Sequence, residues 1–469
     1  DATGQPVEYK NQVKGEAYFL RALANFETFK RYGGFPIVEG RVLPSSSGTL
    51  ARNTIKECID FIVKDCNTAL EMLNLVPGFP TVEHTGRASK SAIKALKAKT
   101  LLFAASPLFN TGTPYLSMDN PANNTLICYG NFDKERWKLA ADAAKDAIVT
   151  ANIEGFMLLD DPAKRSPNVS DLTKPIIGNY REAWEKPDNK ELIMSYKGFP
   201  TAGWWEYPWL SMTPMGSYPG SWMAPPCPSQ NFIKLYEKKA DGMPQVWPTS
   251  GSDLNVKYRE LDNRFHQTIG YNMMPYWPGT INELQNYKAG NGFGAGQHSP
   301  QCKTGYWVKK CVPNEVGAGQ MIVPVISVFR YNELLLNLAE ALNEYESAPN
   351  TEAYDAVNKI RIRSGMPALP AGLTTDQFRK RVQNERSIEF AFEGHRFWDI
   401  RRWLIAETVQ TGPLLGLTIT RINSANTDFQ YVEKTVEIRN WPKRQYLHPI
   451  QRDELTRNTG FVQNPGYLK

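Results

Sequence analysis

The sequence predicts a mostly α-helical, single-domain protein in which two helical outer regions support a loop-rich, few-stranded middle region. Apolar residues recur at helical spacing through residues 7–150 and again through residues 327–469. Between them, residues 151–326 are rich in Gly, Pro, Trp and Tyr, and seven of the twelve tryptophans lie from Trp204 to Trp307. We therefore expect a helical scaffold that carries a region of irregular loops.

In the first helical region, each predicted helix is rich in alanine or ends at a Gly or Pro signal. The predicted helices span Glu16–Tyr32, Thr54–Leu73, Ser89–Ala105 and Trp137–Thr150. Small residues allow paired helices to pack closely, so this region is similar to helical-hairpin arrays of the tetratricopeptide type. The repeat period is interrupted by long insertions.

The second helical region begins near Ser327 and shows the same apolar spacing. Its predicted helices span Val328–Ala341, Glu352–Ser364 and Asp376–Glu393, and the tail from Val432 mixes in strand-like residues. The middle region has short strand-like stretches separated by Pro and Gly turns, at Glu191–Tyr196, Tyr306–Val312 and Met321–Phe329. Long, weakly structured connections in a compact protein are often binding loops.

Charge and cysteine content exclude several classes of function. The formal net charge of +6 is spread along the chain without a basic block, which argues against nucleic acid as the main partner. No apolar run reaches the ~18–20 residues that a transmembrane helix needs. The six cysteines show no metal-binding spacing. Cys302 and Cys311 could face each other across a hairpin, but separate buried thiols are the favoured interpretation.

The segment Arg386–Trp403 combines arginines, acids and aromatic residues around Gly394. Within it, helical spacing predicts ion pairs between Arg386 and Glu389, and from Asp399 to both Arg396 and Arg402. His395 could be a general base oriented by Asp399, but nothing in the sequence places this segment in a pocket. We expect a structural network, with the aromatic side chains Phe397, Trp398 and Trp403 in the core. By the same reasoning, Arg259, Asp262, Asn263 and Arg264 are expected to form a structural turn.

The candidate ligand-binding residues are aromatic. The run Trp204–Trp209 is dense in rings and interrupted by proline, so it does not fit an ordinary strand. Flat rings can cover the apolar faces of sugar rings while neighbouring polar groups bind the hydroxyls. The predicted ligand-binding residues are Trp204, Trp205, Tyr207, Trp209, Trp222, Tyr276 and Trp277. The alternative is that these rings pack loops onto the helices.

Signatures of catalysis are weak. The chain has no nucleophile elbow and no phosphate-binding loop, and its histidines are scattered. The glycine-rich stretch Gly290–Gly296 follows no clear strand and fits a loop better than a nucleotide site. A glycosidase needs two carboxylates across a cleft, which sequence spacing does not reveal. We therefore predict no catalytic residues and no metal ligands, and calcium as a cofactor finds no support in the sequence.

Seven stretches, in order along the chain, carry a resemblance to one family. They are Gly15–Ala22, Arg31–Pro36, Leu102–Asn110, Val357–Pro367, Asn384–Trp403, Tyr446–Ile450 and Gln463–Tyr467. In these stretches the chain resembles the SusD/RagB-like proteins, cell-surface lipoproteins of Bacteroidota that capture nutrients for an outer-membrane transporter. At its front the chain departs from the family pattern, because only about fourteen residues precede the Gly15–Ala22 stretch.

The resemblance implies a binding protein that is exposed at the outer membrane and passes oligo- or polysaccharide to a SusC-like TonB-dependent transporter. It also implies an N-terminal lipid anchor, which is expected to lie outside the given sequence. Peptide capture, as in RagB-like relatives, is the main alternative. A surface glycoside hydrolase and a protein-binding helical-repeat adaptor are less favoured.

Overall fold

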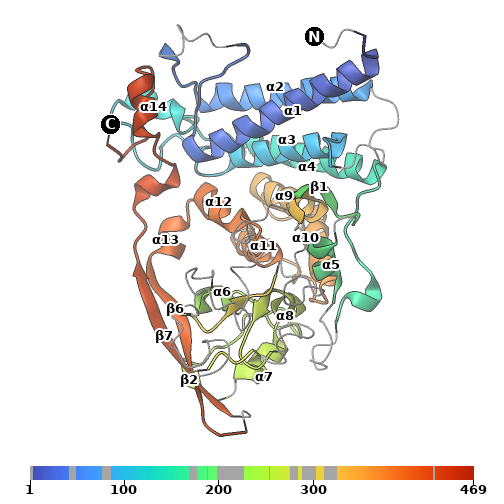
Figure 1. Ribbon diagram of the computed structural model, residues 1–469, viewed down its shortest axis with the longest axis vertical. Helices are drawn as coiled ribbons and strands as arrows, with labels where there is room; N and C mark the ends of the chain where they lie inside the picture. The colour runs from blue at the N-terminus through green and yellow to red at the C-terminus, as the bar shows by residue number, and fades with distance from the viewer. Residues whose placement is uncertain are drawn as a thin grey trace.

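A computed structural model shows a mostly helical fold with three small sheets among the residues that it describes (Figure 1). The prediction of a helical scaffold with few strands is therefore confirmed. The structure describes residues 4–41, 49–75, 86–167, 177–186, 189–197, 227–252, 254–274, 284–287, 303–310, 325–425 and 428–468.

The first four long helices are those predicted from apolar spacing, but the first begins at Val7 rather than Glu16. They are α1 (Val7–Tyr32), α2 (Ile55–Asn74), α3 (Lys90–Ala105) and α4 (Glu135–Ile153). Two of these helices begin at a side-chain cap: Thr54 and Glu57 form a capping box at α2, and the Ser89 hydroxyl accepts a hydrogen bond from the Ala92 amide at α3. Short 3₁₀ helices follow at Pro121–Leu126, Pro162–Lys164 and Lys443–Tyr446.

The second helical region contains α9 (Tyr331–Tyr345), α10 (Thr351–Arg363), α11 (Thr375–Glu389), α12 (His395–Arg402), α13 (Ala406–Gln410) and α14 (Arg452–Arg457). Three predicted boundaries in this region were wrong, and one of them is the end of α9, which lies at Tyr345 rather than Ala341. The first helix begins at Tyr331 rather than Val328, because the preceding residues pair in a strand. The helix that starts at Thr375 ends at Glu389 rather than Glu393, where Phe392 and Gly394 adopt positive φ angles of 61° and 82°.

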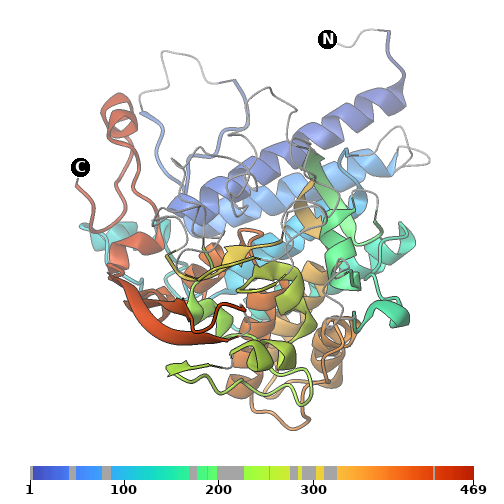
Figure 2. The same cartoon turned by 60° about the horizontal axis from the view of Figure 1, so that its bottom comes forward.

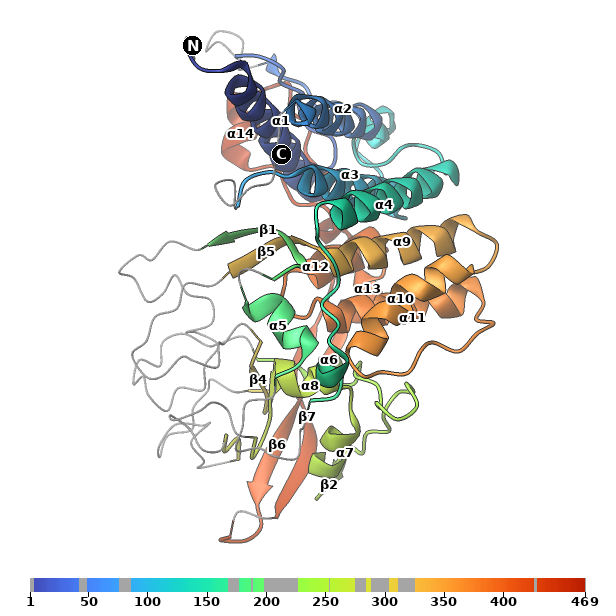
Figure 3. The ribbon, with the colours of Figure 1, turned by 90° about the vertical axis from the view of Figure 1, so that its right-hand side faces the viewer.

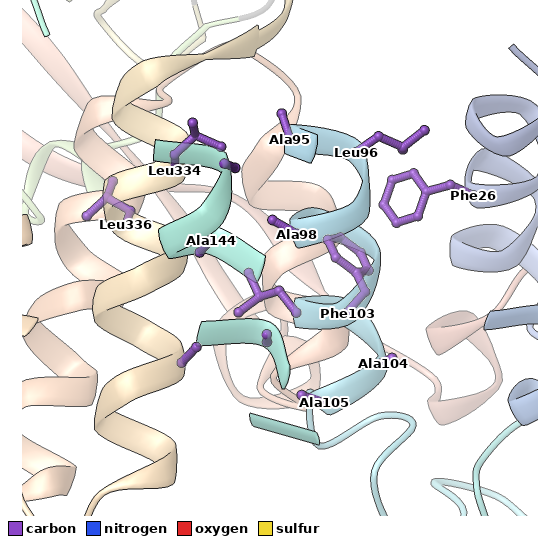
Figure 4. Packing of buried hydrophobic residues seen from close by; sticks show 14 of the residues in the cluster. Phe26, Ala95, Leu96, Ala98, Phe103, Ala104, Ala105, Ala144, Leu334 and Leu336 are labelled. Carbon is purple, nitrogen blue, oxygen red and sulfur yellow. The ribbon is translucent and has the colours of Figure 1, made fainter. Parts of the chain in front are cut away.

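The long helices stack in chain order to build one continuous core. Helix α1 packs on α2, α2 on α3, α3 on α4 and α4 on α9, and α9 is covered by α10 and α11 (Figure 3). Helix α3 lies in the centre of this stack, with Phe26 of α1 on one side and Leu334 and Leu336 of α9 on the other (Figure 4). The alanines of α3 are small enough to let its neighbours approach closely.

The middle region is built of short elements that lie beside and below helices α9 to α11 in Figure 3. They are α5 (Asn179–Glu185), β1 (Leu192–Lys197), α6 (Gln230–Ile233), β2 (Ser250–Gly251), α7 (Leu254–Glu260), α8 (Asn263–Thr268), β3 (Ile269–Gly270) and β4 (Trp307–Val308). Strand β1 pairs antiparallel with β5 (Val325–Arg330), and β3 pairs antiparallel with β4. The strands predicted at Glu191–Tyr196, Tyr306–Val312 and Met321–Phe329 are thus confirmed in their described parts.

A long hairpin near the C-terminus was not predicted. Strand β6 (Gly412–Arg421) pairs antiparallel with β7 (Phe429–Arg439), and β2 joins the other edge of β7. The hairpin curves along the outside of the middle region (Figure 2). Its inner face, which includes Leu417 and Tyr431, is buried in a second core made mainly by the middle region. The C-terminal hairpin therefore packs against the middle region and covers part of its core.

Candidate functional site

All seven predicted ligand-binding residues lie outside the described residues. Trp204, Trp205, Tyr207, Trp209 and Trp222 belong to residues 198–226, here called the first aromatic segment. The remaining two, Tyr276 and Trp277, belong to residues 275–283, here called the second aromatic segment. The structure does describe the chain that flanks both segments, and this flanking chain defines the candidate site.

The flanks of the two aromatic segments meet at one small apolar cluster. Cys227, the first described residue after the first segment, packs against Leu284 and Trp307. Leu284 is likewise the first described residue after the second segment, and its amide and carbonyl bond to Met274 and Met273. Residues 227, 284 and 307, here called the segment base, therefore bring together two parts of the chain that are far apart in sequence.

Asparagine side chains hold the segment base in place. The buried indole of Trp307 donates from Nε1 to Oδ1 of Asn286 at 2.8 Å, and Nδ2 of Asn286 donates to the Gly305 carbonyl at 3.0 Å. The backbone N–H of Asn286 donates to Oδ1 of Asn272 at 2.9 Å. Because an unpaired buried amide is costly, these bonds fix the position of Trp307. No sequence pattern indicated this arrangement.

Most described aromatic rings of the middle region form core. The rings of Tyr258, Phe265 and Tyr271 stack or tilt against one another within 4.8–5.2 Å between centroids. The hydroxyls of Tyr258 and Tyr306 lie 2.7 Å apart, and Tyr306 also donates to Gln230 at 2.6 Å. Burial raises the pKa of Tyr258 well above its ordinary value. These rings therefore form the core of the middle region. They have the packing role that was the alternative interpretation for the candidate aromatic residues.

A buried set of ion pairs joins the middle region to α11. Arg264 of α8 bonds to Asp262 at 2.7 Å, Glu385 at 2.6 Å and Glu389 at 2.9 Å. Burial alone would lower the pKa of Arg264, but the three carboxylates raise it well above its ordinary value. Lys310, next to β4, bonds to Glu393 at 2.6 Å. The predicted structural turn is only partly correct, because Arg259 lies in α7 and Asn263 and Arg264 lie in α8, whereas Asp262 caps α8 between the two helices.

The same ion pairs extend through the scaffold. Arg330 bonds to Glu191 at 2.8 Å and to Glu393 at 2.5 Å, and Arg363 bonds to Glu191 at 3.0 Å and also to Glu389. Although burial alone would raise it, the surrounding arginines hold the pKa of Glu389 below its ordinary value. These residues are here called the charged network: Glu191, Asp262, Arg264, Lys310, Arg330, Glu340, Arg361, Arg363, Glu385, Arg386, Glu389, Glu393, Asp399 and Arg402.

The segment Arg386–Trp403 supplies the centre of this network, and its structural role is confirmed. The predicted pair of Asp399 with Arg402 is present at 2.8 Å. Arg386, however, pairs with Asp399 at 3.0 Å instead of Glu389, and Arg396 donates to the hydroxyl of Ser387 instead of Asp399. Glu389 forms its ion pairs with Arg264 and Arg363 instead, which are distant in sequence.

His395 is not oriented by Asp399. Its ring stacks on Phe390 with centroids 4.3 Å apart, and its Nδ1 lies 3.8 Å from Glu333. Burial, reinforced by nearby cations, lowers the pKa of His395 well below its ordinary value, so the ring is neutral. Trp403 is buried as predicted, but Phe397 is 44% exposed, because it covers Arg401 at the surface. A pocket beside His395 was also not predicted.

No described residues form a cluster of His, Cys, Asp or Glu that could hold a metal ion. Cys58 and Cys66 are buried thiols whose pKa burial raises to about 12, whereas Cys302 and Cys311 lie outside the described residues. In the described part of the chain, no helix has the length and apolar character that crossing a membrane requires.

Comparison with known proteins identifies the family. The profile of the SusD family matches residues 190–467, and a second profile, described as starch-binding and associating with the outer membrane, matches residues 3–102. A SusD-like protein, P38, of Formosa agariphila is 24% identical over 439 residues, which cover 88% of this chain and 70% of the relative.

Solved structures share the fold. A SusD-like protein from Bacteroides fragilis has a TM-score of 0.76 and 25% identity, covering 99% of this chain and 81% of its own. A SusD-like carbohydrate binding protein from the same species has a TM-score of 0.70 and 20% identity, covering 98% and 81%. Since the SusD profile matches more than half of the chain, the protein belongs to the SusD family, whose members are binding proteins without catalytic activity.

Proposed function

We propose that this protein captures oligo- or polysaccharide at the outer membrane through its two aromatic segments, within a ligand-binding region of residues 151–326. The observation that carries the proposal is the segment base, where Cys227, Leu284 and Trp307 bring the flanks of both segments together. Trp222 precedes Cys227 by five residues, and Trp277 follows Met274 by three. Rings from both segments can then serve one ligand.

The families and relatives support a carbohydrate ligand. The profile that matches residues 3–102 is described as starch-binding, and one solved structure with this fold is a carbohydrate binding protein. The chemistry of the segments agrees, because ring faces cover the apolar faces of sugars. Burying each ring contributes on the order of 1–3 kcal/mol, so two or three rings give micromolar to millimolar affinity after the cost of association.

The test is affinity electrophoresis against a panel of polysaccharides, followed by calorimetry on those that retard the protein. The variants Trp204→Ala, Trp205→Ala and Trp277→Ala should each weaken binding by about 5- to 150-fold where the ring contacts sugar. Phe132→Ala is the matched control, because its ring is 65% exposed and lies in the first helical region. The proposal is wrong if no polysaccharide in the panel binds at millimolar sugar, and a positive result with a peptide panel would then favour peptide capture.

Transfer to a SusC-like transporter and attachment through an N-terminal lipid are part of the same proposal. The second profile, described as associating with the outer membrane, supports this location. Isolation of the full-length protein from outer membranes, with its transporter retained by an affinity tag, would test both statements. A protein that stays in the soluble fraction without a transporter would contradict them.

A further inference from the structure

A pocket of about 230 Å³ lies within the scaffold, between α1, α3, β5 and the start of α12. At about 30 Å³ per water molecule, it has room for about seven waters, or for one sugar-sized ring. A Cβ built at Gly394 meets nothing within 4 Å, so the pocket is open on that side. Its lining combines apolar and charged side chains: Glu27, Lys30, Lys99, Phe103, Ser327, Val328, Glu393, Gly394, His395, Trp398 and Asp399.

Positive charge exceeds negative charge around this pocket. The ammonium of Lys30 bonds to Glu27 at 2.5 Å, and Arg31 bonds to the same carboxylate. The ammonium of Lys99 lies 2.8 Å from Glu333. Three cations therefore share two carboxylates. Lys30 is only 10% exposed, so water screens its charge weakly.

The other two carboxylates of the lining do not compensate for this excess. Glu393 is held by Lys310 at 2.6 Å and by Arg330 at 2.5 Å. Asp399 is likewise held by two arginines of the charged network. Because each of these carboxylates is already balanced, the excess charge near Lys30 and Lys99 remains.

Two uncharged polar groups in the lining also lack hydrogen bonds to any described residue. They are the imidazole of His395, which is neutral and offers one donor and one acceptor, and the hydroxyl of Ser327. Helix α12 starts at the pocket and has no side-chain cap, so the positive end of its dipole adds to the excess of positive charge.

We propose that this pocket is a second ligand site, which binds a small hydroxylated carboxylic acid such as a hexuronic acid. The carboxylate lies between Lys30 and Lys99, and the ligand hydroxyls bond to Ser327 and His395. Burial lowers the pKa of Lys30 to about 8, so a bound carboxylate also relieves the cost of keeping this ammonium charged. The site is separate from the aromatic segments, and the inference does not rest on the proposed capture of polysaccharide.

Calorimetry of the full chain with sodium glucuronate at pH 7 tests the proposal, with glucose as the neutral probe. Glucuronate should bind at least about tenfold more tightly than glucose, because the carboxylate forms charge-assisted hydrogen bonds. Lys30→Met should abolish this preference. It leaves Glu27 paired with Arg31, so the fold should survive. Ser327→Leu is a second variant that fills the pocket without removing a charge.

Lys56→Met is the matched control, because Lys56 pairs with Asp60 on the exposed face of α2 and is not among the residues that line the pocket. The inference is overturned if glucuronate binds no better than glucose, or if Lys30→Met and Ser327→Leu both leave its affinity unchanged. Loss of glucuronate binding in Trp205→Ala would also overturn it, because the acid would then bind at the aromatic segments. If no polysaccharide in the panel binds, the glucuronate affinities of these variants are still informative. The two proposals can therefore be refuted independently.

Discussion

Replacing Arg264 by methionine should destabilise the protein strongly. Methionine keeps the apolar stem but removes the guanidinium, which donates to Asp262, Glu385 and Glu389 in the closed core between the middle region and α11. All four side chains are at least 97% buried. The substitution therefore leaves three buried carboxylates with one cation fewer.

The size of the loss follows from the partners that remain. Glu385 keeps Arg361 at 3.0 Å, and Glu389 keeps Arg363 and also Asn332 at 2.6 Å. The cost is then that of one uncompensated buried charge rather than three. Removing one partner of a buried ion pair costs about 3–5 kcal/mol, and we expect the free energy of unfolding to fall by that amount.

Urea unfolding followed by circular dichroism measures the change. The control is Arg457→Met, the same substitution at an ion pair with Glu454 where the arginine side chain is 74% exposed. Exposed pairs contribute about 0–1 kcal/mol, so this variant should unfold like the wild type. A difference of less than about 1 kcal/mol between the unfolding free energies of Arg264→Met and Arg457→Met would contradict this prediction, because the network would then contribute no more stability than a surface pair.

Two further predictions concern a close backbone approach and a buried histidine. Gly34→Ala should lower the free energy of unfolding by about 1–3 kcal/mol in thermal or urea unfolding, because a Cβ there would lie 2.0 Å from the Asn53 carbonyl oxygen. Gly40→Ala is the control and should be neutral, because a Cβ at Gly40 meets nothing within 4 Å. Equal stability of the two variants would contradict this prediction. Burial lowers the pKa of His266 to about 3. Between pH 6.5 and 3, the histidine therefore binds a proton in the unfolded chain but not in the folded protein. The free energy of unfolding falls as the pH falls through this range. His266→Gln should therefore lose about 2 kcal/mol less than the wild type between pH 7 and pH 5, and parallel pH profiles would disprove the assignment.

The helices could be predicted from sequence because their signals are local. The apolar face of α2 and its capping residue Thr54 lie within one stretch of chain, and the same holds for Ser89 and α3. Where an element depends on a distant partner, prediction failed. Residues Val328–Arg330 continue the apolar pattern of α9, yet they pair with β1, more than a hundred residues earlier.

The hairpin of β6 and β7 shows a second limit. Its buried alternation covers only short parts of the strands, such as Leu417 with Ile419 and Phe429 with Tyr431, while most of the rest is exposed. Alternating burial over so few residues does not distinguish a strand from a loop. The seven aromatic residues of the candidate site were predicted from composition alone, and they remain a proposal. In the segment base, Cys227 packs against Leu284, 57 positions later, and Trp307, 80 positions later. No local sequence pattern indicates such contacts.

The charged network explains how a scaffold of common helices can hold an irregular middle region in one position. Apolar packing alone tolerates small shifts, because it is not directional. A fork of hydrogen bonds such as that of Arg264 allows one geometry only, and its loss leaves charges buried. Arg264 and Lys310 flank the β3–β4 pair, and β4 contains Trp307 of the segment base. The charged residues of Arg386–Trp403 therefore act on the middle region by fixing the segment base, which adjoins both aromatic segments.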